Sequence, residues 1–395
     1  MITHIEVSNF KSFKDLDIDL DNFNVLIGAN GAGKTNFINL FKFLHDISIV
    51  GLNEAISNQG GVKYLKNTNA SFEEPFVLKI QSNEDLEINK IKFNSFEYIL
   101  SLNFNDSQYK INHEEIIIKG SNYGFKIFKG NNFEIKGLND NTINIEVIGN
   151  INLEEIIPKS TLDMTQIMIN ENSNLSLLET PLTNLPPYWS SIFKDLNFYD
   201  IDPKKSKELA KLNGKITLKE DGENLALFVN EIIENNKEKF LNLLKFLIPT
   251  IDNIIIDEFI AKNSIFFKVK EKFSDEDFPS WYISDGSNHI ISIIVILYYI
   301  QSKTIFIEEI DRNIHPKLLS RLKLMIDDAL KEKQIITTTH NGEFLKHLDL
   351  DNILLIRRDE NGFSNITRPS ENEDVKAFLD EEIGIDELFV DDLLW

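Results

Sequence analysis

The sequence predicts an α/β fold in which a phosphate-loop sheet is combined with an antiparallel β lobe and a helical insertion. Three observations support this prediction. A short apolar strand, Phe23–Ile27, leads through a glycine-rich turn into a helix with apolar residues at i, i+3, i+4 and i+7. Short alternating runs fill residues 72–148. Helical periodicity returns in Asn224–Leu247, before further strand-like segments.

Four segments follow from these patterns. Residues 1–70 and 251–395 are expected to form the two halves of one lobe, and the glycine-rich loop lies in the first half. Between them, residues 71–150 are expected to form an antiparallel β subdomain and residues 151–250 a mixed or helical insertion. The expected strands are Ile2–Asn9, Leu16–Leu20, Phe23–Ile27, Phe76–Ile80, Ile88–Phe93, Tyr98–Phe104, Glu115–Ile118, Tyr123–Phe128, Ile143–Ile148, Ile254–Phe259 and Ser264–Lys270.

The composition of the 395-residue chain excludes several kinds of site. The chain has no cysteine, which rules out disulfides, thiolate zinc sites, iron–sulfur clusters and cysteine nucleophiles. The first residues lack the basic and apolar regions of a signal peptide, so we expect a cytoplasmic protein. The longest apolar run, Ile290–Ile300, is shorter than the about 20 residues that span a membrane, and we expect a buried helix and no membrane contact.

The net charge of -22 argues against a surface that binds nucleic acid everywhere. Two basic segments, Lys204–Lys215 and Lys331–Lys333, are interpreted as solvated helix faces. A local basic groove that contacts DNA is the alternative for both.

The glycine-rich turn is a complete phosphate-binding loop, Gly28-Ala29-Asn30-Gly31-Ala32-Gly33-Lys34-Thr35. Its glycines let successive backbone N–H groups point at phosphate oxygens, and the following helix presents its positive N-terminus to the same anion. Lys34 is expected to reach the β- and γ-phosphates of ATP, and Thr35 to ligate Mg²⁺. The predicted nucleotide contacts are Gly28, Asn30, Gly31, Ala32, Gly33, Lys34, Thr35 and Asn36.

A second element is the strand Thr304–Ile307, which ends in the paired carboxylates Glu308 and Glu309. Beside a phosphate loop, one carboxylate holds the hydrated Mg²⁺ and the next polarises the attacking water. We therefore predict Glu308 as a metal ligand and Glu309 as the catalytic base. Most such sites have Asp first, and the longer Glu308 side chain suggests a metal contact through water.

A third element, Ile283-Ser284-Asp285-Gly286-Ser287, precedes the apolar helix. A Ser-x-Gly turn at a helix N-terminus can bind an anion. Ser, Asp and Gly are also common helix caps, which is the simpler interpretation of the turn by itself. Its position, one helix ahead of the paired carboxylates, favours the anion-binding interpretation.

The order of these elements, ending in Thr337-Thr338-Thr339-His340, resembles the ABC-type ATPase heads of the RecF/SMC type. It resembles more closely the small bacterial RecF-like or OLD-like ATPases without a coiled coil or TOPRIM nuclease. The matching stretches are the opening strand Ile5–Phe13, the turn Asp221–Leu225, the acidic motif Glu308–Pro316 and Thr339-His340. The resemblance implies that His340 senses the γ-phosphate and that Glu309 and His340 are catalytic.

The resemblance also implies a homodimer in which two heads sandwich two ATP molecules. Ser284 and Gly286 of one head would then contact the γ-phosphate bound by the other, with Asp311 and His315 near the dimer seam. The turn departs from the transporter form Leu-Ser-Gly-Gly-Gln, and neither Gln59 nor Gln81 is a convincing glutamine loop.

No second catalytic site is predicted. A TOPRIM site needs a separate Glu and an Asp-x-Asp pair on a further domain, and Asp349-Leu350-Asp351 is interpreted as an ordinary turn before the strand Ile353–Ile356. His113-Glu114-Glu115 lacks the second His of a zinc protease helix. His289 stands alone in the sequence and is interpreted as a packed or solvated histidine.

The leading hypothesis is an ATP-hydrolysing dimeric switch in DNA repair or anti-phage defence that controls a separately encoded effector. The acidic tail ending in Phe389–Trp395 is either a docking segment for that effector or a last element packed on the core. The alternatives for the whole chain are an ATP-dependent scaffold with little or no hydrolysis, and the nucleotide-binding subunit of a membrane transporter.

Overall fold

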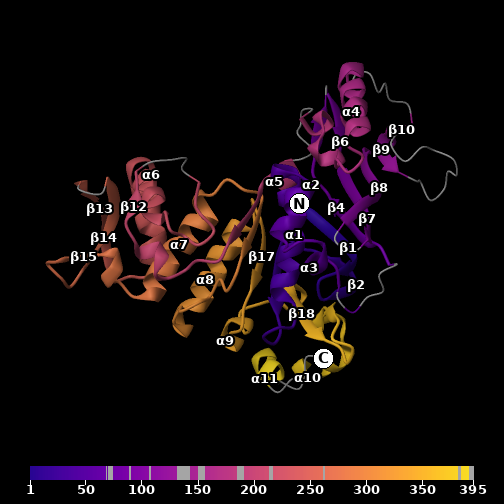
Figure 1. The fold of residues 1–395 in the computed structure, drawn as a ribbon. Coiled ribbons are helices and arrows are strands. Elements are labelled where there is room, and N and C mark those ends of the chain that lie inside the picture. The colour runs from indigo at the N-terminus through magenta and orange to yellow at the C-terminus, as the bar shows by residue number, and fades with distance from the viewer. Residues whose placement is uncertain are drawn as a thin grey trace. The chain divides into compact units, whose positions relative to one another are not determined.

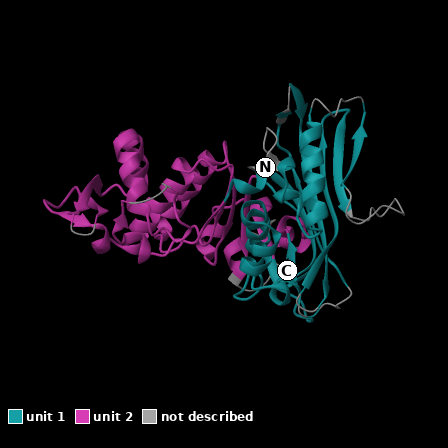
Figure 2. Cartoon of the chain, turned by 45° about the horizontal axis from the view of Figure 1, so that its top comes forward, with its two compact units in different colours: residues 1–21, 28–196, 356–367 teal, residues 22–27, 197–355, 368–395 magenta. Residues whose placement is uncertain are grey.

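A computed structural model describes residues 1–67, 69, 74–88, 90–105, 108–130, 143–149, 156–184, 191–212, 217–260, 263–380 and 384–390 (Figure 1). The chain divides into two compact units that alternate along the sequence (Figure 2). Unit 1 comprises Met1–Asp21, Gly28–Leu196 and Ile356–Thr367, and unit 2 comprises Asn22–Ile27, Asn197–Leu355 and Arg368–Trp395.

A seven-stranded sheet in the order β10-β9-β8-β7-β4-β1-β2 forms the framework of unit 1, and its neighbouring strands pair antiparallel. In β4 every second residue is buried, as expected for a strand with one face on a core. The strands are β1 (Ile2–Phe10), β2 (Phe13–Asp19), β4 (Phe76–Ser82), β7 (Ser95–Asn105), β8 (Gln108–Lys119), β9 (Gly124–Gly130) and β10 (Ile143–Ile148), and β5 (Leu86–Ile88) and β6 (Ile91–Phe93) form a separate hairpin.

Helix α1 (Lys34–Val50) is the longest helix described in unit 1 and begins within the phosphate loop, at Lys34. Its predicted apolar face, Phe37, Leu40, Phe41 and Leu44, is buried. Phe43 on the same helix packs edge-on against Phe76, with ring centroids 5.8 Å apart. The other helices of unit 1 are α2 (Leu52–Asn58), α3 (Val62–Leu65), α4 (Lys159–Glu171), α5 (Ser191–Lys194) and the short 3₁₀ helices η2 (Leu177–Glu179) and η3 (Pro181–Asn184).

The His113-Glu114-Glu115 segment has a structural role in unit 1. The Glu114 carboxylate is fully buried and accepts hydrogen bonds from Tyr98 Oη at 2.7 Å, Ser176 Oγ at 2.5 Å and Leu177 N at 2.8 Å. Burial raises the pKa of Glu114, and the hydrogen bonds oppose that shift. The network holds the η2 segment against β8.

In unit 2 the central strands are parallel: β16 (Thr304–Ile307) pairs with β17 (Gln334–Thr338), β17 with β3 (Phe23–Ile27), and β3 with β18 (Ile353–Arg358). Within unit 2 the strand order is β11-β16-β17-β3-β18, with β11 at Leu196–Tyr199. The next strand along the chain, β19 (Ser364–Thr367), belongs to unit 1. Strands β3, β16 and β17 are buried along their whole length, as is usual for parallel strands covered on both faces.

A smaller sheet of unit 2 has the order β12-β14-β13, with β15 paired to β14. Its strands are β12 (Ala210–Lys211), β13 (Ile251–Phe259), β14 (Ser264–Glu271) and β15 (Asp277–Pro279). The helices of unit 2 are α6 (Leu225–Leu247), α7 (Asp285–Tyr299), α8 (Pro316–Ala329), α9 (Gly342–Leu345), α10 (Glu373–Asp380) and α11 (Ile385–Val390), with 3₁₀ helices η4 (Lys205–Lys207), η6 (Ser280–Tyr282), η7 (Leu350–Asn352) and η8 (Pro369–Glu371).

Most predicted elements are confirmed. The apolar run Ile290–Ile300 forms the buried part of α7, and the described residues contain no helix long and apolar enough to cross a membrane. The turn at Asp349–Asp351 is confirmed by η7. The helical part of the tail, α11, packs on the core of unit 2 through the fully buried Leu388, and residues 391–395 lie outside the described part of the chain.

Three local predictions are wrong. Ile88–Phe93 is not one strand, because the chain reverses so that Ile88 pairs with Ile91, next to Lys90 at a positive φ of 72°. The segment from Lys204 is not a helix face but the short η4 followed by β12, with residues 213–216 outside the described set. Lys333 is buried and donates to the Ile300 carbonyl, so Lys331–Lys333 is no solvated helix face either.

Candidate nucleotide-binding site

The phosphate loop of unit 1 needs glycine where its backbone approaches other segments of the chain. Gly28 has φ 151°, and a Cβ there would lie 2.1 Å from the Ile356 carbonyl oxygen. Gly33 has φ 125°, and a Cβ there would lie 2.5 Å from Ser364 Oγ. A side chain at either position would push the loop away from these contacts, and L-residues rarely adopt such φ values.

Residues far along the sequence hold the loop in place. Arg358 donates from Nε to the Gly31 carbonyl at 2.8 Å, and Ser364 Oγ donates to the Ala32 carbonyl at 2.5 Å. Ser364 Oγ also lies 2.7 Å from Ser12 Oγ, and Asn36 Nδ2 donates to the same Ser12 hydroxyl at 2.8 Å. These contacts fix the loop carbonyls, which lets the N–H groups face the opposite side.

The loop and the start of α1 fit a triphosphate. The ammonium of Lys34 donates to the carbonyls of Gly28 at 2.6 Å and Ala29 at 3.1 Å, so it already lies within the loop. The N-cap Gly33 offers no side-chain cap, and the first turn of α1 has no acidic residue. A helix N-terminus of this kind attracts an anion.

Each unit contains one of the two predicted metal ligands, Thr35 in unit 1 and Glu308 in unit 2. Thr35 is exposed and Glu308 is half-buried. Among the described residues, no group of three or more His, Asp or Glu side chains could hold a metal. A single hydroxyl or carboxylate fits Mg²⁺, because this ion is usually bound by one or two protein groups together with substrate phosphates and waters.

The parallel strands of unit 2 end at one edge of the sheet. In register, Ile307 of β16 lies beside Thr337 of β17, and Thr338 lies beside Leu26 of β3. The residues that directly follow these strands in the sequence are Glu308 after β16, Thr339 after β17 and Gly28 after β3. Ligands of open α/β sheets bind at the carboxyl ends of the strands, and in unit 2 the segments of Glu308 and Thr339 begin there.

Glu309 adopts a backbone conformation that is unusual for its residue type. Its φ is 49°, in the left-handed region, and its N–H donates to Thr338 Oγ1 at 2.9 Å. Its carboxylate accepts a hydrogen bond from Arg312 Nε at 2.7 Å, and the same guanidinium donates to Asp200 Oδ1 at 2.9 Å and to the Ile201 carbonyl at 2.9 Å. Strained residues of this kind cluster at functional sites.

Asp311 lies inside unit 2, and its expected place near a dimer seam stays a prediction. It is 5% exposed, and burial raises the pKa of its carboxyl group, opposed by hydrogen bonds from the side chains of Thr339 and Asn341. These bonds connect the acidic motif to the segment after β17. His340 in that segment is exposed, and so is His315, which caps α8 by accepting from Lys317 N at 3.2 Å.

Ser284 acts as the N-cap of α7. Its Oγ accepts from Ser287 N at 3.1 Å, which confirms the capping interpretation of the turn without testing the second one. Gly286 has a different constraint, because a Cβ there would lie 2.3 Å from the Asn313 carbonyl oxygen. The start of α7 therefore touches the loop that follows Glu309.

His289 adds a second contact between α7 and this loop. It is 1% exposed, and its Nε2 donates to the Ile310 carbonyl at 3.1 Å. Burial lowers its pKa to about 4, so the ring is neutral at pH 7. The predicted packed histidine is thus also a positioning residue for the acidic motif.

The structure brings the predicted residues together in two groups. The phosphate-loop residues Gly28–Asn36 belong to unit 1, whereas Ser284, Gly286, Glu308, Glu309 and His340 belong to unit 2. Sequence reasoning missed Ser12, Asp200, Arg312, Arg358 and Ser364, which support these groups. Their roles depend on contacts across the chain, and no local pattern identifies them.

Comparisons with known proteins identify the relatives of this arrangement. A family model described as "AAA domain, putative AbiEii toxin, Type IV TA system" matches residues 23–346. The chain is 23% identical over 366 residues to an ATP/GTP phosphatase of Helicobacter pylori (strain ATCC 700392 / 26695), a match that covers 88% of each protein. A stretch of 44 residues is 46% identical to the DNA replication and repair protein RecF of Lactobacillus acidophilus, covering 11% of this chain and 12% of RecF.

A solved structure shares the fold. The SMC head bound to the C-winged helix domain of ScpA is 14% identical and has a TM-score of 0.53, over 93% of this chain and 97% of that one. The predicted fold class and the predicted resemblance to RecF/SMC-type heads are therefore confirmed. The chain belongs to the AAA-domain ATPase family whose model it matches, and it has the fold of an SMC head.

Proposed function

We propose that this ATPase is a dimeric switch that binds ATP at Gly28–Asn36 and hydrolyses it at a site completed by a second copy. The observation that carries the proposal is the loop geometry: two glycines that admit no Cβ, a lysine ammonium held among the loop carbonyls, and an uncapped helix N-terminus. The similarity to an ATP/GTP phosphatase over most of both chains supports hydrolysis.

The residues of the chain would divide the work as follows. Lys34 and the N–H groups of the loop bind the β- and γ-phosphates, and Thr35 and Glu308 would hold Mg²⁺, which neutralises phosphate charge. Glu309 orients and deprotonates the attacking water, and His340 contacts the γ-phosphate. The Arg312 guanidinium beside Glu309 fixes the carboxylate in one orientation.

Ser284 and Gly286 would complete the site of the other copy. Ser284 is exposed, and its helix α7 has 15 residues and points its N-terminus outward from the buried part of the helix. The contacts of Gly286 and His289 with the loop after Glu309 would link the occupancy of one site to the catalytic loop of the other.

We place the switch in DNA repair or anti-phage defence, acting through a separate effector. The toxin family description and the short match to RecF support this role. The related SMC head is bound to a domain of another protein, ScpA, which supports a partner for this head too. A cytoplasmic location stays a prediction.

One observation favours a second candidate, a scaffold that binds ATP and hydrolyses it slowly. Oε2 of Glu309 already accepts a hydrogen bond from Arg312 Nε at 2.7 Å, which leaves this oxygen less available to an attacking water. Glu308 in place of Asp supports the same candidate. If wild-type protein turns ATP over no faster than Glu309→Gln, the scaffold is the better description.

Mixing two inactive variants tests the shared site. Lys34→Met removes the phosphate-loop lysine, and Ser284→Arg blocks the turn offered to the partner. Each variant alone should be inactive, whereas an equimolar mixture should recover about a quarter of the wild-type rate, because half of random twofold dimers are mixed and each of those has one complete site. Ser173→Arg, at an exposed serine of unit 1, is the control and should keep the wild-type rate. A mixture that stays at background refutes completion by a second copy.

A further inference from the structure

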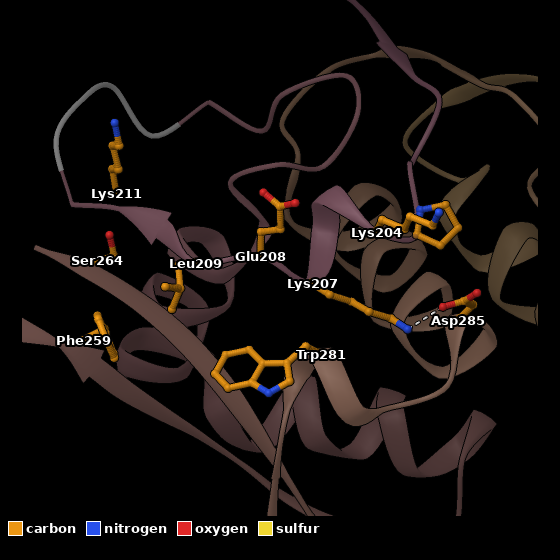
Figure 3. Close-up of a pocket in the computed structure, with 10 residues that line it drawn as sticks. Lys204, Lys207, Glu208, Leu209, Lys211, Phe259, Ser264, Trp281 and Asp285 are labelled. Carbon is orange, nitrogen blue, oxygen red and sulfur yellow. Dashed lines mark hydrogen bonds and ion pairs between the residues drawn. The ribbon is translucent and has the colours of Figure 1, made fainter. Parts of the chain in front are cut away.

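A cavity of about 980 Å³ lies in unit 2, beside the turn that leads into α7 (Figure 3). It lies where the η4–β12 segment passes the ends of β13 and β14. Its size is at the upper end of the range for pockets that hold small molecules. The lining residues are Pro203, Lys204, Lys207, Glu208, Leu209, Lys211, Phe259, Ser264, Trp281 and Asp285.

The cavity offers an aromatic surface to its occupant. Trp281 is 45% exposed and Phe259 is 42% exposed. The indole of Trp281 packs against the buried Phe266, with ring centroids 4.9 Å apart, which fixes its position at the edge of the cavity opposite Glu208 and Leu209 (Figure 3). A half-exposed, rigid indole is a favourable surface for stacking a flat ring, and base–aromatic stacking contributes strongly to nucleotide binding.

The charge of the lining is opposite to that of the chain as a whole. Among the described residues, three lysines and two carboxylates line the cavity, in a chain with a net charge of -22. The ammonium group of Lys207 already has protein partners, because it forms an ion pair with Asp285 and donates to the Ile283 carbonyl at 2.7 Å. Of the other charged lining residues, Lys204 and Lys211 are positive and Glu208 is negative, and both lysines are exposed. This excess of positive charge favours an anionic group such as phosphate.

We propose that this cavity is a second nucleotide site, which binds an aromatic base on Trp281 and a phosphate group at Lys204 or at Lys211, which lie on opposite sides of the cavity (Figure 3). The same chemistry is offered by a free nucleotide and by a single-stranded nucleic acid. Lys207 connects the site to the Ser-x-Gly turn, because its ammonium binds the residues on both sides of Ser284. An occupant would thus lie against the turn that we propose completes the partner's ATP site. The binding itself does not depend on that proposed function.

Two probes distinguish the sources of the ligand: 5′-AMP, followed by calorimetry, and a fluorescein-labelled single-stranded dA oligonucleotide, followed by anisotropy. Both are measured in full-length Lys34→Met protein, so that the phosphate loop cannot account for binding. Binding of AMP alone supports a free nucleotide as the ligand, and binding of the oligonucleotide supports a strand. Failure of both probes to bind overturns the proposal.

Variants localise the binding. Trp281→Ala should lower the affinity for the probe about tenfold or more, and Trp281→Phe should retain most of the affinity. Lys204→Ala with Lys211→Ala should weaken binding and, for the oligonucleotide, lower the slope of log K against log salt by about 0.7 per lysine. Tyr64→Ala, at an exposed aromatic residue of unit 1, is the control and should bind as the parent does. Unchanged affinity in Trp281→Ala, with an unchanged thermal unfolding curve, also overturns the proposal.

Discussion

The Nε atom of Arg312 lies 2.7 Å from Oε2 of Glu309, and the same guanidinium reaches Asp200 and the carbonyl of Ile201. One side chain therefore ties the acidic motif after β16 to the segment after β11. The Glu309 backbone has a positive φ of 49°, and a residue persists in that region where its surroundings fix it, here through Arg312 and through the hydrogen bond from Glu309 N to Thr338 Oγ1.

Arg312→Ala should destabilise the protein by about 2 kcal/mol, because it removes three hydrogen bonds and leaves a half-buried carboxylate without its partner. The midpoint of urea unfolding measures the change. Arg321→Ala is the matched control, since Arg321 donates from Nη1 to the Phe246 carbonyl at an exposed position, and its midpoint should stay close to wild type. Equal shifts in the two variants would show that Arg312 has no special role.

Gly33→Ala should abolish ATP binding. The new methyl would meet Ser364 Oγ at 2.5 Å and would force an alanine to a φ of 125°. Gly61→Ala is the control for backbone strain alone, because Gly61 also has a positive φ of 86° but no atom lies within 4 Å of the place that a Cβ would take. It should cost about 1 kcal/mol and leave binding intact. Both variants are titrated with fluorescent ATP, and a Gly33→Ala protein with wild-type affinity would contradict the loop geometry.

Gly286→Ala should slow hydrolysis with little effect on the binding of ATP to a single copy. A Cβ there would lie 2.3 Å from the Asn313 carbonyl and would displace the loop after Glu309, and a misplacement of about 1 Å can cost about 100-fold in rate. In Gly342→Ala the nearest atom to the new methyl is 3.5 Å away, so this control should retain the wild-type rate. Steady-state kcat and ATP affinity are compared for the Gly286→Ala and Gly342→Ala proteins. A wild-type rate in Gly286→Ala would contradict the proposed link between the start of α7 and the loop after Glu309.

His289 should make the stability of the protein depend on pH. The pKa of His289 is about 4 in the folded protein and about 6.5 in the unfolded chain. Between these two pH values the unfolded chain therefore binds a proton at His289 and the folded protein does not. The neutral histidine's contribution is fully present above pH 6.5 and is lost as the pH falls toward 4, by about 3 kcal/mol. Thermal unfolding from pH 7.5 to 4.5 should show a smaller loss for His289→Gln than for wild type or His347→Gln. Parallel curves for all three proteins would contradict the assignment.

The elements that could be predicted from the sequence are those whose signals are local. The strand Phe23–Ile27, the helix after Lys34 and the strand Thr304–Ile307 all form at the predicted positions, because each combines a hydrophobic period with a clear boundary residue. The phosphate loop itself was predictable because its glycines and lysine are adjacent in the chain.

Residues that act at a distance were not predictable. Arg358 donates to the Gly31 carbonyl although 327 positions separate the two residues, and no sequence pattern around either residue predicts the contact. The burial of Asp311 could not be predicted for a related reason: the Thr339 and Asn341 side chains that bond its carboxylate follow a different strand. The lysines from Lys204 onward were assigned to a helix because charge patterns do not distinguish a helix face from the rim of a cavity.

ATP hydrolysis at Glu309 is tested most directly by the release of phosphate from ATP, with Mg²⁺ present, by wild-type protein and by Glu309→Gln. We predict steady turnover by wild type and a rate about 100-fold lower for Glu309→Gln, with ATP binding retained in both. Equal rates in the two proteins, at equal ATP occupancy, would contradict the assignment of Glu309 as the catalytic base.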